Sequence, residues 1–211
     1  TGEERKAVKK SPFKDCSTKK LAEMTRKLDP TRPVTAGCNE PNPYNHLFAS
    51  GALDIIGFNY HDDWFMGVPT NFPGMPFIVT ESVSGLMTRG YYRMPSDEPV
   101  VCPERWDRPY YDPSFSCSSY DNCRVPWGNH HEGTLKLVQN NDFISGQYIW
   151  TGFDYIGEPT PYGWPARSSY FGIVDLAGFP KDVPTSGVRH KAMIIEIKTS
   201  SHFSLLDKAF I

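Results

Sequence analysis

The residue with the clearest chemical potential is Glu81, which follows an apolar stretch. Residues 76–80, PFIVT, have the composition of a buried strand. Carboxylates are rarely buried without partners, so a carboxylate in this place needs hydrogen bonds or a reaction to perform. Such a group can act as a nucleophile, a general acid or a general base. The structural alternative is a Glu that caps the next helix.

Three other apolar stretches also end in polar or aromatic residues. They are residues 33–38, 54–60 and 147–150, and the residues at their ends are Asn39, Tyr60 with His61, and Trp150. Aromatic rings at such points offer flat faces to sugar C–H groups, and a tyrosine hydroxyl can orient a carboxylate. Taken singly, each ring is explained equally well by core packing.

These stretches predict parallel strands in an α/β fold. They are nearly continuous apolar runs rather than alternating ones, which is typical of parallel strands covered on both faces. Helical or long loop segments separate them, as in repeated βα units. In parallel α/β barrels the catalytic groups sit at the carboxyl ends of the strands, and four such strands make half a barrel.

Two helices are predicted between the apolar stretches. In residues 18–28 the side chains of Leu21, Met24 and Leu28 recur at helical spacing and form one apolar stripe. Pro30 ends this helix, because proline disfavours the helical conformation in the residue before it. Residues 132–140 are the second helix. The proline-rich stretch 88–130 has little periodicity and is expected to be a rim loop or lid.

Composition and charge exclude several classes of partner. Lys and Arg total 22 against 24 Asp and Glu, for a net charge of −2, which does not indicate a nucleic-acid or anionic-membrane partner. No run approaches the roughly 18 apolar residues of a membrane span. Aromatic residues reach 14%, a share that suits a carbohydrate-binding cleft.

The cysteines and histidines do not predict a metal site. The five cysteines form no Cys-x-x-Cys pair and no His lies at zinc-ligand spacing. Cys117 and Cys123 have the spacing for a bridge in an oxidising compartment, although the odd total argues against a full disulfide framework. His130 and His131 precede a predicted helix and are expected to be surface residues.

Several motifs then carry a family resemblance. They are residues 28–35 (LDPTRPVT), 78–82 (IVTES) and 148–155 (YIWTGFDY), followed by 156–165 (IGEPTPYGWP) and 169–175 (SYFGIVD). In this order they resemble glycoside hydrolase family 2, and within it the bacterial β-galactosidases. The resemblance covers roughly residues 18–182.

The resemblance implies a fold and a role for each site residue. The fold would be a partial (β/α)8 TIM barrel, roughly strands five to eight. Glu81 would be the nucleophile of a retaining glycosidase, forming a glycosyl-enzyme that water hydrolyses. Tyr60 would donate a hydrogen bond that keeps Glu81 ionised, and Trp150 would line the pocket for the terminal sugar. The other substrate-binding residues would be Asn39, His61 and Glu158, and no metal or organic cofactor is needed.

A second carboxyl group is expected to be missing. Retaining glycosidases need an acid/base about 5–5.5 Å from the nucleophile, and in this family it precedes the helix that residues 18–28 resemble. Upstream of that helix the chain has only residues 1–17, where Glu3 and Glu4 lie in a charged context without a predicted strand. Glu40, in an Asn-Glu-Pro sequence, is an alternative, but a single predicted strand separates it from Glu81 where the family has two. The chain alone is therefore expected to be inactive.

The resemblance also divides the chain and sets its partners. Residues 1–17 are a divergent basic segment, residues 18–182 the second half of the barrel, and residues 183–211 a divergent tail. A β-galactoside is the expected substrate, with β-glucuronidase or β-mannosidase specificity as alternatives. A half barrel predicts self-association or pairing with the missing half. A non-catalytic sugar-binding or interaction fragment is the competing class. Family analogy suggests a periplasmic or secreted protein, while the cysteines leave the compartment undecided.

Overall fold

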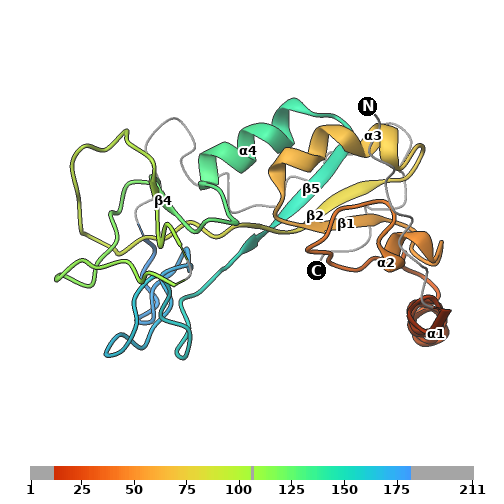
Figure 1. The fold of residues 1–211 in the computed structure, drawn as a ribbon, viewed down its shortest axis with the longest axis horizontal. Helices are drawn as coiled ribbons and strands as arrows, with labels where there is room; N and C mark the ends of the chain where they lie inside the picture. Colours follow the sequence, from red (N-terminus) through yellow and green to blue (C-terminus); the bar gives the residue numbers. More distant parts are fainter. Residues whose placement is uncertain (1–11, 106, 182–211) are drawn as a thin grey trace, which may run out of the picture.

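The computed structural model of the chain describes residues 12–105 and 107–181 (Figure 1). The predictions for the tail at 183–211, and for Glu3 and Glu4, lie outside the described residues. The elements are, in chain order, α1 Pro12–Leu28, α2 His46–Ala49, β1 Ile56–Asn59, η1 Asp62–Gly67, α3 Val68–Asn71, β2 Phe77–Val83, β3 Val100–Val101, β4 Cys123–Arg124, α4 His131–Asn140 and β5 Ile144–Trp150. No described helix has the length and apolar character that crossing a bilayer requires.

The centre of the fold is a three-stranded parallel sheet. Its order is β1-β2-β5, and both neighbouring pairs are parallel, as the continuous apolar runs predict. Helix α4 packs against β5 and β2 (Figure 1). The sheet is open in the described residues and does not close into a barrel. Tyr148 on β5 is 41% exposed, so the expectation that these strands are covered on both faces is wrong for β5.

One of the four predicted strands, the segment of residues 33–38, does not form a regular strand. The segment runs beside β1, where the Cys38 carbonyl accepts from the Asn59 N–H over 2.9 Å. At its other end a side chain replaces a strand partner, because the Val34 N–H donates to the Asp54 carboxylate over 2.7 Å. A side chain at Gly57 would collide with the backbone of this segment. Glycine in β1 therefore lets the segment lie close to the sheet without a full ladder.

Aromatic side chains form the core beside the sheet. The ring of Phe77 on β2 packs edge-on against Phe58 and Phe65, with centroids 4.9 and 5.4 Å away. Such edge-to-face contacts add to the stability from burial alone. Ile144 of β5 and Val138 of α4 belong to the same buried cluster. This cluster ties the strands and the helix together at the end of the sheet away from the loops.

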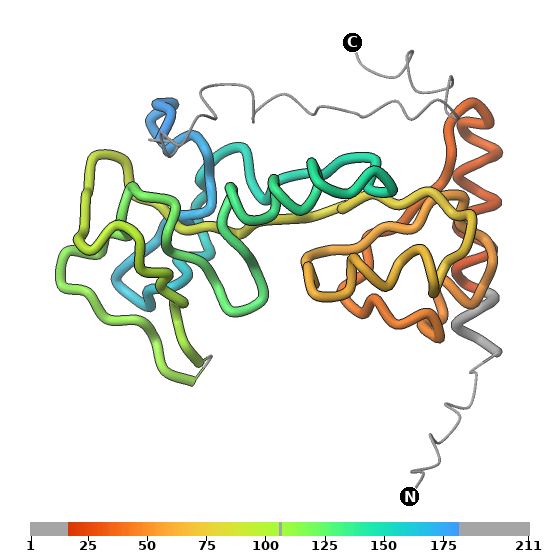
Figure 2. The backbone as a smooth tube through the Cα atoms, turned by 90° about the horizontal axis from the view of Figure 1, so that it is seen from above, coloured from red at the N-terminus to blue at the C-terminus, as the bar shows by residue number. Residues whose placement is uncertain are grey.

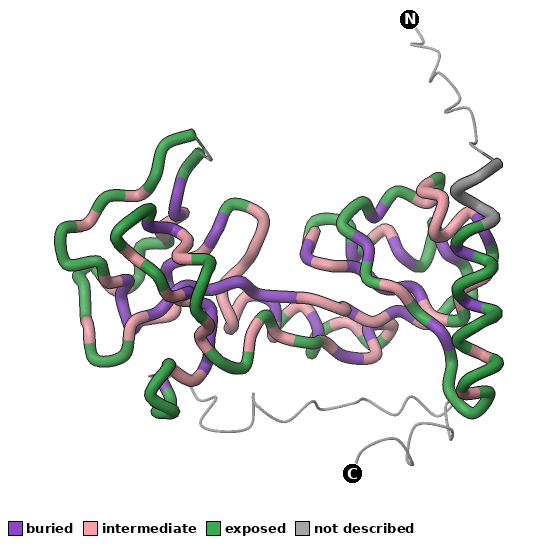
Figure 3. The backbone as a smooth tube through the Cα atoms, turned by 90° about the horizontal axis from the view of Figure 1, so that it is seen from below, coloured by how far each residue is buried: buried purple, intermediate pink, exposed green. Residues whose placement is uncertain are grey.

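Helix α1 confirms the predicted helix and its end at Leu28, but its buried face is a different one. Leu21, Met24 and Leu28 are 63%, 50% and 87% exposed, whereas Ala22 is buried. The helix is exposed over most of its length (Figure 3). It is held from the inner face, where Arg26 donates to the Asp54 carboxylate over 2.9 Å and also forms an ion pair with it.

The proline-rich stretch 88–130 is part of a second, loop-rich lobe. Figure 2 shows this lobe joined to the rest of the molecule by the extended ends of β2 and β5. Its core includes Leu86, Val125, Tyr162 and Phe171, so the stretch packs against the segment that follows β5. The short pair β3 and β4 lies within it. The stretch that was expected to be a rim loop is thus part of a lobe with its own hydrophobic core.

The structure corrects two further sequence predictions, one at the start of α4 and one in the loop-rich lobe. His131 is not a surface residue: its Nδ1 lies 2.8 Å from Asp121 Oδ1, and only 12% of its side chain is exposed. Asp121 also accepts from the first N–H groups of α4 and so caps that helix. Cys117 and Cys123 are free thiols, and the Cys123 Sγ lies 3.3 Å from the Cys102 Sγ.

We expect Phe77→Ala to lower the free energy of unfolding by about 3–5 kcal/mol, because it removes a fully buried ring from the aromatic cluster. Urea unfolding followed by circular dichroism measures the change. Leu28→Ala is the matched control, and its exposed side chain predicts a change below about 0.5 kcal/mol. Equal effects of the two substitutions would contradict the assignment of the core.

Candidate functional site

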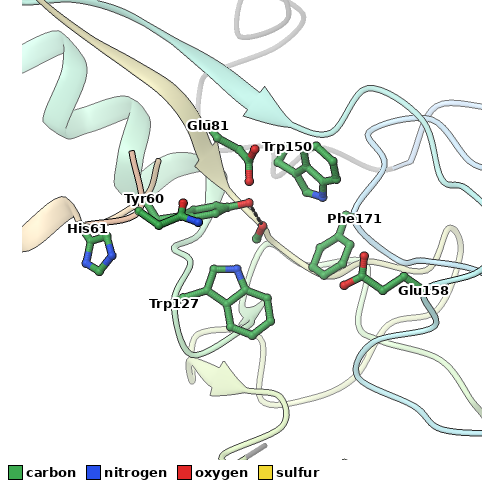
Figure 4. Close-up of a pocket in the computed structure, with 9 residues that line it drawn as sticks. Tyr60, His61, Glu81, Trp127, Trp150, Glu158 and Phe171 are labelled. Carbon is green, nitrogen blue, oxygen red and sulfur yellow. Dashed lines mark hydrogen bonds between the residues drawn. The ribbon is translucent and has the colours of Figure 1, made fainter. Parts of the chain in front are cut away.

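All six residues proposed from the sequence line one pocket. The pocket has a volume of about 390 Å³ and opens at the boundary between the sheet and the loop-rich lobe (Figure 4). A volume of this size suits a small ligand such as a single sugar ring. The lining side chains are those of Asn39, Tyr60, His61, Glu81, Ser84, Trp127, Trp150, Glu158 and Phe171.

Parallel pairing brings the central residues of the pocket together. Glu81 on β2 is in register with Asn59 at the end of β1. Trp150, the last residue of β5, is in register with Val83 at the end of β2. Glu81 lies two residues before the end of β2, because that strand runs further than the sequence pattern indicates. The carboxyl ends of three parallel strands therefore meet at one edge, which is where such folds place ligands.

The chain leaves β1 and β2 through left-handed backbone conformations. Tyr60 and His61 follow β1 with φ of 54° and 60°, and β2 ends at Val83 and Ser84 with φ of 73° and 57°. Non-glycine residues rarely adopt this region, and a β-branched residue such as Val83 is strained there. After these bends the side chains of Tyr60 and Ser84 are hydrogen-bonded to each other. The strained backbone conformations therefore occur where the pocket is formed.

The phenol of Tyr60 lies between Ser84 and Glu81. Its oxygen accepts from the Ser84 hydroxyl over 2.9 Å, and Figure 4 shows the Glu81 carboxylate facing the same oxygen. Burial, and then the interaction with Glu81, raise the pKa of Tyr60 well above its usual range. The phenol beside Glu81 therefore stays protonated across the neutral pH range.

Glu158 reaches the pocket from the loop after β5 and is held by a second tyrosine. The Tyr155 hydroxyl donates to Glu158 Oε2 over 2.7 Å, and the Tyr155 ring packs edge-on against Trp150 with centroids 6.0 Å apart. Burial, followed by the hydrogen bond to Glu158, raises the pKa of Tyr155 to about 12. The carboxylate therefore has a neutral, fixed donor across the neutral pH range.

Glu40 is not among the residues that line the pocket, although its neighbour Asn39 is. Its exposed carboxylate accepts a 3.3 Å hydrogen bond from the Asn45 side chain. Glu81 and Glu158 are the two carboxylates of the lining. The described residues contain no group of three or more His, Cys, Asp or Glu side chains placed to bind a metal.

Sequence reasoning missed three lining residues. Ser84 lies three residues after Glu81, but nothing in its sequence context predicts a bend that turns it toward Tyr60. Trp127 lies in the proline-rich stretch, which has no periodicity to place it. Phe171 belongs to the family motif at 169–175, and that motif was the available signal. Its buried ring forms part of the pocket wall.

The arrangement suits chemistry at the ring of a polar ligand. Glu81 presents a carboxylate that faces the Tyr60 phenol, the Trp150 indole lies beside it, and the Trp127 indole lines the pocket further from the carboxylate (Figure 4). An oriented carboxylate can attack an electrophilic carbon, and aromatic faces accept the C–H face of a sugar. Glu158 adds a second acceptor for hydroxyl groups.

Comparison with known proteins shows similarity to glycoside hydrolases. No family model matches the chain. The β-galactosidase BoGH2A of Bacteroides ovatus is 73% identical over 166 residues, which are 79% of this chain and 20% of that protein. A protein of Formosa agariphila, provisionally named a β-glucuronidase, is 30% identical over 184 residues, 75% of this chain and 16% of that protein. The chain thus spans about a fifth or less of the length of these curated relatives.

A solved structure supports the same relationship. The crystal structure of a β-glycosidase from Bacteroides vulgatus matches with a TM-score of 0.61 and 28% identity, over 84% of this chain and 24% of that one. The homologues are glycoside hydrolases, and the resemblance to family 2 predicted from the motifs agrees with them.

Tyr155 is expected to titrate near pH 12, about two units above a free tyrosine. The raised pKa means that the neutral phenol persists through pH 10 and ionises only well above it. Absorbance at 295 nm, taken as the difference between the parent chain and Tyr155→Phe, measures this titration. Glu158→Gln should lower the pKa while burial keeps it above 10. A midpoint near 10 in the parent chain would contradict the hydrogen-bonded geometry. Circular dichroism at each pH confirms that the fold persists.

Proposed function

We propose that this chain is the nucleophile-bearing half of the catalytic (β/α)8 barrel of a retaining β-galactosidase. The observation that carries the proposal is the Glu81 carboxylate at the carboxyl edge of a parallel sheet, where it faces the neutral phenol of Tyr60 (Figure 4). A nucleophilic carboxylate must be ionised and correctly oriented, and a phenol beside it can donate a hydrogen bond that favours both. Trp150 supplies the wall against which the terminal sugar lies.

The reaction would be a double displacement. A Glu81 carboxylate oxygen attacks the anomeric carbon, and the bond from that carbon to the aglycone oxygen breaks as this oxygen takes a proton from a general acid. Water then attacks the glycosyl ester and gives up a proton to the same group, now a base. Galactose leaves with its configuration retained and Glu81 is free again. This chemistry calls for no metal or organic cofactor.

The general acid/base is proposed to come from outside the described residues. Glu158 is engaged by Tyr155, and Glu40 lies outside the pocket lining. Without an acid, an alkoxide leaving group departs slowly. The chain alone is therefore proposed to be inactive on ordinary galactosides while its nucleophile remains competent.

The barrel half would consist of the segment 33–38, β1, β2 and β5 as strands five to eight. Two features support exposed edges that the missing half or a second copy would cover. The apolar side chains of α1, Leu21, Met24 and Leu28, are exposed at one side, and Tyr148 of the terminal strand β5 is exposed at the other. Self-association or pairing follows from such edges.

A galactoside is the preferred substrate because the 73% identical relative is a β-galactosidase. Because the 30% identical relative is named a β-glucuronidase, a glucuronide is an alternative substrate. A β-mannoside is a second alternative. A non-catalytic sugar-binding fragment is the second candidate function. It is favoured by a pocket whose second carboxylate, Glu158, accepts a hydrogen bond from Tyr155 and is not placed as the acid.

The test uses a substrate whose leaving group needs no proton. We expect 2,4-dinitrophenyl 2-deoxy-2-fluoro-β-galactoside to add one fluorogalactosyl group to Glu81 of the chain, because dinitrophenolate departs without acid assistance and the fluorine slows hydrolysis of the ester. Intact-protein and peptide mass spectrometry locate the adduct. Azide should accelerate turnover of the corresponding non-fluorinated galactoside, since it replaces water without needing a base.

Glu81→Gln should abolish labelling, and Glu40→Gln is the matched control that should not change it. Saturable galactose binding with no adduct at Glu81 would favour the non-catalytic candidate. An adduct on another residue would overturn the assignment of the nucleophile.

Tyr60→Phe should slow labelling of Glu81 by about tenfold or more, because it removes the hydroxyl group that is proposed to donate to the carboxylate. Ser84→Ala leaves the phenol in place and removes the hydroxyl that donates to it, so a smaller loss of about two- to fivefold is expected. The rate of adduct formation measures both, with circular dichroism to show that the fold is kept. Equal rates of labelling in the parent chain and in Tyr60→Phe would contradict the proposal that Tyr60 orients Glu81.

A further inference from the structure

The lining of the pocket is negatively charged. Its nine residues include two carboxylates, Glu81 and Glu158, and neither lysine nor arginine. The remaining members are His61 and aromatic or neutral polar side chains. In the part of the chain that the structure describes, a ligand entering this pocket therefore meets acceptors and negative charge rather than a cation.

Basic groups of the neighbouring loops are held by other partners. Lys181 is buried and its Nζ lies 2.7 Å from the Asp154 carboxylate. The Arg124 guanidinium donates to the backbone carbonyls of Val125 and Gly128 at 3.1 and 2.9 Å. Moving either group to the pocket would break these contacts, so neither is free to neutralise an anionic ligand.

Glu158 is exposed to solvent, and a tyrosine holds one of its carboxylate oxygens. Tyr155 donates to one of its oxygens, Oε2, and the Tyr155 ring packs against Trp150, the wall of the pocket. Figure 4 shows the Glu158 carboxylate at the side of the pocket opposite Tyr60. A carboxylate has about four acceptor positions, so the bond to Tyr155 leaves others for the hydroxyl groups of a ligand.

We propose that Glu158, held by Tyr155, makes this pocket select terminal galactosides that are neutral and reject those that carry a carboxylate or sulfate. The inference rests on the proposed function and adds the substrate class. Neutral hydroxyl groups donate to Glu158 and are attracted to it. An acidic substituent can only accept when ionised and is repelled by both Glu158 and Glu81.

The sharpest probe is a pair of sugars that differ only at C6. D-Galactose has a hydroxymethyl group there and D-galacturonate has a carboxylate. Dissociation constants of both for the full chain are measured by NMR titration at neutral pH, and their ratio is the readout. We expect galactose to bind at least threefold more tightly. Glu158→Gln, which keeps the shape and removes the charge, should reduce this ratio by about three- to tenfold, the size of one interaction between solvent-exposed charges.

Two further variants separate charge from shape. Tyr155→Phe keeps the charge of Glu158 but loosens its position, so it should weaken galactose binding and leave the rejection of galacturonate largely intact. Glu132→Gln on α4, whose carboxylate pairs with Lys136, is the matched control and should not change the ratio. Raising the salt concentration should reduce the ratio in the parent chain, because salt screens exposed charges.

The outcomes distinguish this inference from the proposed function. Galactose binding with Glu81 labelling, but an unchanged ratio in Glu158→Gln, overturns the inference alone. Galacturonate binding as tightly as galactose in the parent chain overturns it as well. Failure of the chain to bind galactose and to form the Glu81 adduct overturns the proposed function and with it the inference.

Discussion

The site depends on parallel pairing of β1, β2 and β5. Parallel strands deliver their carboxyl ends to one edge, so residues from distant parts of the sequence arrive together. Register decides which ones: Asn59 pairs with Glu81, and Val83 with Trp150. A slip of one residue would turn Glu81 to the opposite face of the sheet. The aromatic cluster around Phe77, buried at the start of β2, is what opposes such a slip.

The second constraint is the pair of left-handed bends that follow β1 and β2. They oppose the normal preference of non-glycine residues, and packing must compensate for that cost. The loop-rich lobe provides part of it, because the Asn129 N–H donates to the Val83 carbonyl over 2.7 Å and Val125 packs in the second core. A side chain at Gly128 would collide with the same carbonyl. The lobe thus supports the geometry of the pocket as well as supplying Trp127 to it.

Much of this arrangement could be predicted from the sequence. Continuous apolar runs located the three strands and their parallel pairing. The ends of these runs, together with the family resemblance, indicated six of the nine lining residues. The misses have physical causes. Segment 33–38 looks like a strand, but the Asp54 side chain takes the place of a ladder partner. The stripe of α1 has the right spacing for a buried face, yet spacing alone does not say which face meets the protein. Ser84 needed a backbone bend that composition does not encode.

The two carboxylates of the pocket each lie beside a tyrosine of raised pKa. Glu81 faces the phenol of Tyr60, whose oxygen accepts from Ser84 (Figure 4). Glu158 accepts from the Tyr155 hydroxyl, and the Tyr155 ring packs edge-on against Trp150. The charge of Glu81 also contributes to the raised pKa of Tyr155, so the two sides of the pocket are coupled electrostatically. A substitution at either carboxylate therefore changes the pKa of the tyrosine beside Glu158, which depends on both carboxylates in addition to burial.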